Sequence, residues 1–245
     1  MKTALITGAS GAIGSETVKT FIRNGYFVTA QYNKGEDGIN KLIKELDKEN
    51  LSGFINPVKA DFSEIGQAEE LYNKHEKAFK HIDVLVNNAG IDLYKQAQDT
   101  TEKEWDEVFD VNLKAPFILT KKALNNMIER KFGKILFVSS IWGKAGGSLE
   151  SVYSASKSAM IGYVKALAKE VGPSSINVNC VCPGVIRSKM NEGYTASEMQ
   201  DLIDRTPLCR IGEPSEIAEI IYFLCSEKAS FITGQTLTVD GGFIL

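Results

Sequence analysis

The chain opens with a short apolar segment, residues 3–7, that runs directly into the glycine-rich sequence GASGAIG over residues 8–14. A helix-like segment, residues 15–24, follows at once. A buried strand, a glycine-rich turn and a helix N-terminus, in this order, are typical of the first unit of a nucleotide-binding α/β fold. Exposed backbone N–H groups in the turn and the positive end of the helix dipole together bind a phosphate. A glycine-rich turn that only connects a strand to a helix is the alternative interpretation.

Strand-like and helix-like segments alternate along the whole chain. The strand-like segments lie near residues 3–7, 26–32, 54–59, 83–87, 134–139, 176–182 and 235–239, with longer helix-patterned stretches between them. This alternation is typical of βαβ units and a parallel sheet. We therefore predict an α/β fold with one Rossmann-like, doubly wound domain over residues 1–245, whose central, mostly parallel sheet has seven strands and helices on both faces. In the sixth segment Val178, Cys180 and Cys182 share one face of the strand, while Asn179 and Val181 face the other.

Composition agrees with one domain and argues against several classes of partner. The 245 residues are 43% hydrophobic, enough to bury a sizeable core, and no linker, repeat or low-complexity tract interrupts them. The formal net charge of −3 argues against nucleic acids and anionic membranes as partners. No apolar run has the length of a membrane span, and the first strand starts at the N-terminus without a signal peptide, so we expect a cytoplasmic protein.

The cysteines and histidines predict no metal site. No pair of cysteines has the spacing of metal ligands, and only two histidines accompany them: Cys180, Cys182, Cys209, Cys225, His75 and His81. We expect reduced, mostly buried thiols.

The residues at the end of the second strand bear on the choice of dinucleotide. Where this fold binds the ribose 2′-hydroxyl of NAD through an acidic residue, the chain has Tyr32, Asn33 and Lys34. Glu36 and Asp37 come only later, in what we interpret as the loop into the next helix. Lys34 is a candidate cation for a 2′-phosphate, so we favour NADP(H) over NAD(H). A solvated loop lysine is the alternative.

A tyrosine and a lysine four residues apart, Tyr153 and Lys157, are candidates for proton transfer. On a helix this spacing places both side chains on one face. Because a nearby cation favours the phenolate, we expect Lys157 to hold the pKa of Tyr153 below its ordinary value of about 10. Tyr153 would then protonate the alkoxide that forms when a hydride reaches a carbonyl carbon. A solvated helix face is the alternative.

Two more polar residues are candidates for the same site. Ser140 follows the apolar strand over residues 134–138, at the carboxyl end of a parallel sheet, where such folds bind ligands, and would orient the substrate oxygen. Ser139 is the competing candidate. Asn112 lies in a helix-like segment, where the ordinary interpretation is an asparagine that bonds nearby backbone.

Several motifs, in order along essentially the whole chain, resemble the short-chain dehydrogenase/reductase family. The sequence TGASGAIG over residues 7–14 resembles the family's cofactor loop, with Ala12 where the family usually has glycine. NNAG over residues 87–90 resembles its adenine-side turn, PGVI over residues 183–186 its turn beside the nicotinamide, and VDGG over residues 239–242 its C-terminal strand end. The residues that match the family's catalytic tetrad are Asn112, Ser140, Tyr153 and Lys157.

The resemblance implies a role for each matched residue. The family's thirteen-residue step back from the tyrosine selects Ser140 over Ser139. Lys157 would also bond the nicotinamide ribose, and Asn112 would position a water that relays protons to Lys157. The implied cofactor contacts are Gly8, Ser10, Gly11, Ala12, Ile13, Gly14, Tyr32, Asn33, Lys34, Asp61, Phe62, Asn88, Ala89, Gly90, Tyr153, Lys157, Pro183, Gly184, Ile186 and Ser188.

Within the family, the chain resembles most the 3-oxoacyl-acyl-carrier-protein reductase branch, in length and in its last residues, 241–245. This implies NADPH-dependent reduction of a 3-oxoacyl thioester, linked to acyl-carrier protein or to coenzyme A. The branch docks an acidic carrier on basic residues; Arg130 and Lys131 are available, but the chain has Ser174 near a position where the branch often has arginine. The alternatives are reduction or oxidation of another ketone or alcohol, such as a sugar, a steroid or a small diketone, and a non-catalytic nucleotide sensor.

Two further expectations concern a lid and the assembly. The amphipathic segment 187–212 is expected to form a lid over a partly apolar substrate, with plain packing between helices as the alternative. The residues that suggest the lid are Ser188, Met190, Tyr194, Met199, Leu202 and Leu208. In resembling proteins the helix-patterned stretches 101–130 and 153–171 pair across a two-fold axis, which implies a homotetramer, with a monomer as the alternative.

Overall fold

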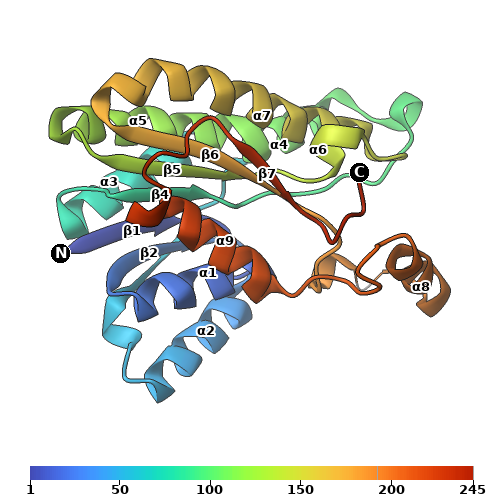
Figure 1. Ribbon diagram of the computed structural model, residues 1–245, viewed down its shortest axis with the longest axis horizontal. Helices are drawn as coiled ribbons and strands as arrows, with labels where there is room; N and C mark the ends of the chain where they lie inside the picture. The colour runs from blue at the N-terminus through green and yellow to red at the C-terminus, as the bar shows by residue number, and fades with distance from the viewer. Residues whose placement is uncertain (192, 245) are drawn as a thin grey trace.

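Seven strands form one parallel sheet in the computed structural model, which describes residues 1–191 and 193–244 (Figure 1). The strands are β1 (Lys2–Ile6), β2 (Tyr26–Tyr32), β3 (Ile55–Lys59), β4 (Val84–Asn87), β5 (Gly133–Val138), β6 (Ile176–Pro183) and β7 (Thr236–Val239). Their order across the sheet is β3-β2-β1-β4-β5-β6-β7, and every neighbouring pair is parallel. The strand order reverses between β1 and β4, so the predicted doubly wound α/β fold is confirmed.

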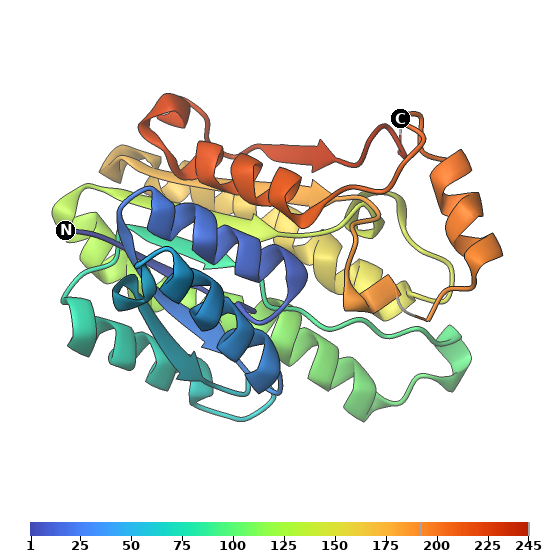
Figure 2. The same cartoon turned by 90° about the horizontal axis from the view of Figure 1, so that it is seen from below.

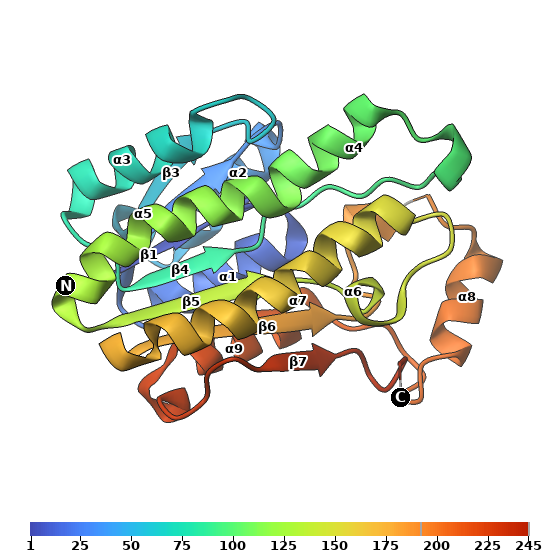
Figure 3. The same ribbon diagram turned by 90° about the horizontal axis from the view of Figure 1, so that it is seen from above.

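Helices cover both faces of the sheet. One face carries α1 (Ala12–Arg23), α2 (Glu36–Lys48) and α9 (Pro214–Cys225), which Figure 2 shows in front of the strands. The other face carries α3 (Gln67–Phe79), α4 (Glu102–Phe109), α5 (Ala115–Arg130), α6 (Trp142–Ala145) and α7 (Ser151–Val171), in front in Figure 3. A further helix, α8 (Ala196–Asp204), stands apart from the sheet.

Short helical turns complete the connections. The 3₁₀ turns are η1 (Ser52–Phe54), η2 (Ala97–Asp99), η4 (Gly172–Ser174), η5 (Lys189–Asn191) and η6 (Glu227–Ala229). A π-helical turn, η3 (Asp110–Lys114), joins α4 to α5 and contains Asn112. Single π-helical turns inside longer helices are frequently found at functional sites.

Two helices begin earlier than the sequence pattern indicates. α1 begins at Ala12, inside the glycine-rich turn, and not near residue 15. α2 begins at Glu36, so the prediction that Glu36 and Asp37 lie in a loop is wrong. Both acids occupy the first turn of α2, where negative charge interacts favourably with the helix dipole. The residues before the two helices, Gly11 and Gly35, make no side-chain capping bond, so the usual sequence signal of a helix start is missing.

The alternation of side chains in β6 divides the hydrophobic core into two layers. Val178, Cys180 and Cys182 pack in the cluster that β6 shares with α3, α5 and α7. Val181 packs in the opposite cluster, with α1, α2 and α9. This confirms the predicted faces, and it leaves β6 buried along its whole length, as expected for a strand covered by helices on both sides.

The cysteines are unpaired, as predicted. Cys180, Cys182 and Cys225 are buried, and Cys209 is exposed. Among the described residues, no helix has both the length and the apolar character needed to cross a membrane.

The carboxyl ends of the strands define the edge at which a functional site is expected. All strands run in the same direction, so these ends meet at one edge of the sheet. α8 lies beyond this edge and the C-terminal segment ends there, as Figures 1 and 3 show. Open α/β sheets bind ligands at this edge, near the point where the strand order reverses.

Candidate active site

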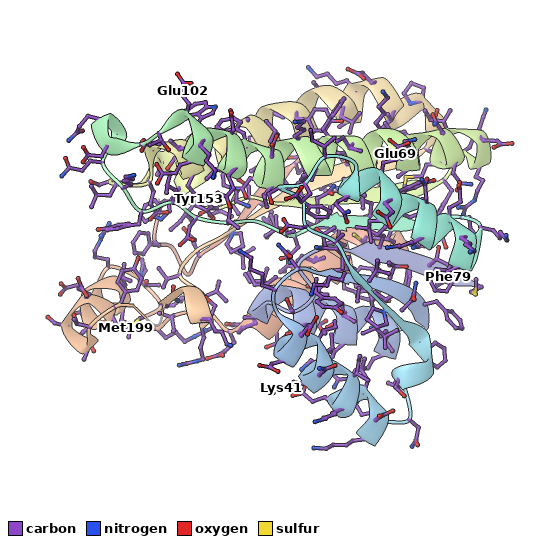
Figure 4. The ribbon with its side chains drawn as sticks, turned by 180° about the vertical axis from the view of Figure 1, so that it is seen from behind. Lys41, Glu69, Phe79, Glu102, Tyr153 and Met199 are labelled. Atoms are coloured by element: carbon purple, nitrogen blue, oxygen red, sulfur yellow. The ribbon has the colours of Figure 1, made fainter. Side chains whose placement is uncertain are left out.

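The four predicted catalytic residues meet at the carboxyl edge of the sheet. Ser140 follows β5, Tyr153 and Lys157 lie in the first turns of α7, and Asn112 lies in η3. All four side chains are buried. Figure 4 shows Tyr153 at the same end of the molecule as Met199 of α8, and far from Phe79 of α3.

Tyr153 is hydrogen-bonded to Ser140, and this geometry separates Ser140 from its neighbour Ser139. The Ser140 hydroxyl oxygen also accepts a hydrogen bond from the Trp142 backbone N–H at 3.1 Å. The Ser139 hydroxyl points the other way and donates to the Lys157 carbonyl oxygen at 2.8 Å. Ser140 is therefore the serine that shares a site with the tyrosine.

The predicted effect of Lys157 on the pKa of Tyr153 is not what the structure shows. Burial raises the pKa of Tyr153 above its ordinary value, and the hydrogen bond with Ser140 opposes this only in part. The Lys157 ammonium lies 5.6 Å from the centre of the Tyr153 ring and donates to the Val138 carbonyl oxygen at 3.0 Å. Burial lowers the pKa of Lys157 to about 8. Desolvation of both groups thus outweighs their mutual attraction here.

Asn112 ties three segments together. Its Nδ2 donates to the Ile91 carbonyl oxygen at 2.9 Å and to Ser156 Oγ at 3.0 Å, and its Oδ1 accepts from the Ile91 N–H at 2.8 Å. These bonds link η3 to the segment after β4 and to α7. The side chain therefore bonds backbone, as the ordinary interpretation holds, and the proton relay implied by the family resemblance stays a prediction.

The glycine-rich turn is closely packed and fits a phosphate. Gly8 has a positive φ of 68°, and its N–H donates to Gln31 Oε1 at 2.8 Å, which binds the turn to β2. A Cβ on Gly14 would collide with the Gly8 carbonyl oxygen. Because Gly11 caps α1 without a side-chain bond, the first N–H groups of the helix, at Ala12 and Ile13, are available to an anion.

Sequence reasoning missed two glycines that shape the same turn. A Cβ on Gly35 would collide with Ser10 Oγ, and a Cβ on Gly38 would lie 2.6 Å from the Ser10 carbonyl oxygen. These glycines let the N-terminus of α2 approach the turn. The available signal was Gly38 in a helix interior, a position where glycine costs stability and thus indicates a close contact.

The residues predicted at the ribose lie at the end of β2, and Asp61, which the resemblance implies as the adenine-contacting acid, follows β3. Hydrogen bonds from Ser63 lower the pKa of Asp61, with further lowering by Asn33 and by the charge of Lys34. Lys34 is exposed, and Tyr32 lies half-buried at the end of β2. Phe62 is buried in the core.

A salt bridge lies beside the ribose-side residues, between Lys59 and Glu36 at 2.8 Å. Glu36 is the first residue of α2, so this ion pair joins the end of β3 to the start of that helix.

The turn after β4 lies between the glycine-rich turn and Lys157. The backbone N–H groups of Asn88 and Ala89 both donate to Thr7 Oγ1 at 2.9 Å, which ties this turn to the end of β1. A Cβ on Gly90 would lie 3.0 Å from Lys157 Nζ. Gly90 therefore leaves the room that the lysine side chain needs.

The predicted nicotinamide-side turn follows β6. Pro183 ends the strand, and a Cβ on Gly184 would lie 2.6 Å from the Asp240 Cβ, so this turn packs directly on the end of β7. Ile186 is buried and forms a parallel bridge with Gly212. Ser188 is half-buried at the start of the predicted lid.

The predicted lid is exposed and is not packed between helices. α8 contains no buried residue, and Tyr194 and Leu208 expose 42% and 62% of their surface. Met199 and Leu202 are partly buried. Of the predicted lid residues, the Met190 side chain lies outside what the structure describes, as does residue 192 within the segment.

A series of side-chain contacts joins the predicted lid to the site, and sequence reasoning missed it. Arg205, which ends α8, lies over the ring of Phe243 at 4.7 Å from its centre. The Phe243 ring meets the Trp142 ring edge-on at 5.9 Å. The glycines before Phe243 allow the contact, since a Cβ on Gly241 would lie 2.8 Å from Thr206. We call Arg205, Phe243 and Trp142 the lid latch.

Comparison with known proteins agrees with this geometry. A family model described as "Enoyl-(Acyl carrier protein) reductase" matches residues 8–244. An uncharacterised oxidoreductase of Bacillus subtilis, YmfI, is 38% identical over 99% of this chain and 98% of its own length. The 3-oxoacyl-[acyl-carrier-protein] reductase FabG of Thermotoga maritima is 37% identical over 100% of this chain and 98% of its own length.

A solved structure extends the match to three dimensions. It is titled a short-chain dehydrogenase/reductase, glucose/ribitol dehydrogenase, from Brucella melitensis. It aligns with a TM-score of 0.89 and 32% identity, over 100% of this chain and 97% of that one. With the parallel sheet, the glycine-rich turn and the buried Ser140, Tyr153 and Lys157 in place, the chain belongs to the short-chain dehydrogenase/reductase family, a family of oxidoreductases with a nicotinamide cofactor.

Proposed function

We propose that the protein is an NADPH-dependent carbonyl reductase whose substrate is a 3-oxoacyl thioester. The observation that carries the proposal is the buried Tyr153 phenol, hydrogen-bonded to Ser140 beside the buried Lys157. The raised pKa of Tyr153 keeps the phenol protonated at neutral pH, as a proton donor must be. The thioester assignment is supported by the 37% identity to a protein named 3-oxoacyl-[acyl-carrier-protein] reductase.

The roles of the residues follow from their positions. When bound, the reduced nicotinamide supplies a hydride to the carbonyl carbon. Ser140 donates a hydrogen bond to the substrate oxygen and orients it, and Tyr153 protonates that oxygen as negative charge develops there. The positive charge of Lys157 stabilises the phenolate that remains. The glycine-rich turn and the N-terminus of α1 bind the diphosphate.

The preference for NADPH over NADH is supported by the residues at the ends of β2 and β3. No acid lies within β2, and Lys34 follows the strand as an exposed cation. A 2′-phosphate placed there would meet this positive charge, whereas an acidic residue would repel it.

The test of the proposal is Tyr153→Phe, which removes one hydroxyl group. We expect kcat for reduction of a short 3-oxoacyl thioester to fall by about 10²- to 10⁴-fold, the usual contribution of a positioned general acid. The affinity for NADPH, followed by its fluorescence, should change little. Tyr163→Phe on the same helix is the matched control, because Tyr163 packs on Phe117 and Phe137 away from the site. Turnover near wild type in Tyr153→Phe would refute the assignment of Tyr153 as the proton donor. A wild-type protein that binds NADPH but reduces no carbonyl substrate would favour the non-catalytic nucleotide sensor.

A second candidate is oxidation or reduction of another alcohol or ketone. The solved structure with a TM-score of 0.89 is titled glucose/ribitol dehydrogenase, which favours a polyol or sugar as the alternative substrate class. The same catalytic residues serve both reactions, so a panel of sugars, steroids and diketones assayed with both cofactors separates the two proposals.

For the assembly we propose a homotetramer. Large apolar side chains are exposed on the first of the two stretches predicted to pair, residues 101–130, at Trp105 of α4 and at Phe117 and Ile128 of α5. A second group of exposed apolar residues follows on α9 and near β7, at Phe223, Phe231 and Leu237. Two separate apolar surfaces fit the two interfaces of a tetramer with two-fold axes. Light scattering checks this, and a monomer at micromolar concentration would contradict it.

A further inference from the structure

The segment after β4 is held against the residues that lead into α7, the helix that carries Tyr153. The Lys95 backbone N–H donates to the Leu149 carbonyl oxygen at 2.7 Å, which joins the segment after β4 to the residues before α7. A Cβ on Gly147 would lie 3.1 Å from the Trp142 ring and 3.3 Å from the Glu150 Cβ. Residues 92–95 and residues 147–150 are therefore fixed relative to each other at the start of α7.

Each of these two segments carries a carboxylate. Glu150 is the residue immediately before α7 and precedes Tyr153 by three residues. Asp92 is exposed on the joined segment. Burial raises the pKa of Tyr194 in the lid, and the charges of Glu150 and Asp92 raise it further. The same two charges raise the pKa of Tyr153, so each carboxylate lies within electrostatic reach of this phenol and of Tyr194.

The nearby cations do not neutralise these carboxylates. Lys95 binds both carboxylate oxygens of Glu104 at 2.9 Å. Arg187 pairs with Glu213. Within the part of the chain that the structure describes, neither Asp92 nor Glu150 forms a salt bridge.

The lid adds further negative charge. α8 carries Glu198, Asp201 and Asp204 and no lysine or arginine. The flanking cations are Lys189, on η5, and Arg205, which lies over the Phe243 ring, while Arg210 pairs with Glu216. Arg130, the predicted carrier contact, does not add positive charge near this site. Its guanidinium binds Asp83 and the Ile82 carbonyl oxygen at the opposite edge of the sheet.

We infer that Asp92, Glu150 and the acidic lid make this site select uncharged carbonyl substrates over substrates attached to an anionic carrier. The inference rests on the proposed carbonyl reductase and narrows its substrate class. Coenzyme A carries phosphates and an acyl-carrier protein is acidic, so both approach a negative rim, whereas a small neutral thioester or keto ester does not. Like charges lower the rate of encounter, and salt screens the effect.

The experiment compares one 3-oxoacyl group on three carriers: N-acetylcysteamine, coenzyme A and an acidic acyl-carrier protein. kcat/KM is measured with saturating NADPH at low salt and at about 0.3 M salt. We expect the neutral thioester to exceed both anionic ones at low salt. Salt should raise kcat/KM for the two anionic thioesters by about 3- to 10-fold and leave the neutral one unchanged. A carrier-bound or coenzyme A thioester that is the better substrate at low salt, and that loses activity with salt, would overturn the inference.

Charge-neutralising variants locate the effect. Asp92→Asn/Glu150→Gln should raise the ratio of kcat/KM for the coenzyme A thioester to that for the neutral thioester by about 3- to 10-fold at low salt. The matched control is Asp47→Asn/Glu129→Gln, which changes the net charge equally at exposed positions of α2 and α5. An equal change of the ratio in both double variants would mean that net charge alone acts, and would refute a role for the rim.

The proposed thioester activity and the inference fail in different ways. If none of the three thioesters is reduced although NADPH binds, the thioester proposal is wrong. The charge preference is then read from a neutral ketone and a keto acid of the same size, found active in the substrate panel. A keto acid preferred at low salt would overturn the inference, and a neutral ketone preferred at low salt would support it.

Discussion

The cofactor side and the substrate side of this site lie along the same edge of the sheet but are built differently. On the cofactor side, backbone packs on backbone: Gly14 touches Gly8, and Gly38 touches Ser10 without room for a Cβ. On the substrate side, an exposed helix, α8, is joined to the body through the lid latch of Arg205, Phe243 and Trp142. The first side is formed by close backbone packing, and the second is an exposed segment, the predicted lid, that is positioned by side-chain contacts. The cofactor side is thus held by backbone contacts, whereas the substrate side depends on the identity of a few side chains.

The two sides also differ in charge. Lys34 is exposed on the cofactor side, next to the Lys59–Glu36 pair, and α1 presents its N-terminus there. Asp92 and Glu150 lie on the substrate side. The cofactor side also holds Asp61, so it carries both signs of charge. The following predictions test the two sides independently.

The largest effect is expected from Gly14→Ala, which breaks the cofactor side. The new Cβ would collide with the Gly8 carbonyl oxygen, and this cost outweighs the better helix propensity of alanine. We expect the affinity for NADPH to fall by at least about tenfold and the free energy of unfolding to fall by about 1–3 kcal/mol. Fluorescence titration and urea unfolding measure these. Gly53→Ala is the control, since its Cβ would meet nothing within 4 Å; wild-type affinity in Gly14→Ala would contradict the close packing.

The pH dependence sharpens the role of Lys157, which lies between the two sides. Burial lowers its pKa to about 8, so the side chain is charged below this pH and neutral above it. Because Tyr153 keeps its proton over this range, kcat/KM for NADPH, which reports the free enzyme, should fall above pH 8 by up to about tenfold per pH unit. In Lys157→Met, whose residual activity is low, the break near pH 8 should be absent. The same break in the variant would assign it to another group.

Lys34→Ala tests whether the cofactor side distinguishes the two dinucleotides. Loss of one charged contact to a 2′-phosphate should lower kcat/KM for NADPH by about tenfold and leave NADH unchanged. Lys48→Ala, an exposed lysine at the other end of α2, is the control. An equal loss of kcat/KM with both cofactors would show that Lys34 does not bind the 2′-phosphate.

The smallest effect is expected from Arg205→Ala, which loosens the lid latch. A cation over an aromatic ring at an exposed site contributes about 0.5–1 kcal/mol, so KM for the carbonyl substrate should rise about 2- to 5-fold. kcat and the affinity for NADPH should not change, because the cofactor side makes no use of this contact. Arg23→Ala, which removes an exposed ion pair with Glu49, is the control. A loss of NADPH affinity in Arg205→Ala would show that the two sides are coupled.

The strands were the part of the fold that could be predicted best. The predicted segment 26–32 coincides with β2, and the predicted faces of β6 are correct, because a buried strand must be apolar on both faces. The helix starts at Ala12 and Glu36 were missed. Their N-caps are Gly11 and Gly35, which make none of the side-chain bonds that mark a helix start in a sequence.

The candidate site was predictable in its residues but not in its electrostatics. Motif spacing was sufficient to select Ser140, Tyr153 and Lys157, since each is tied to a strand end or a helix turn. The pKa of Tyr153 was predicted to lie below its ordinary value, whereas burial raises it. Charge proximity can be estimated from a four-residue spacing, whereas desolvation depends on every element that covers the phenol.

The sequence by itself determined the order of strands and helices, the glycine-rich turn and the catalytic residue types, because these depend on local periodicity and on short motifs. Only the tertiary structure decided that Ser139 faces away from the site, that Asn112 clamps Ile91, and that residues 205 and 243 meet. It also decided that the segment with Asp92 is bonded to the residues before α7, through Lys95 and Leu149. Such contacts join residues far apart along the chain, and neither periodicity nor spacing carries information about which of them come together in space.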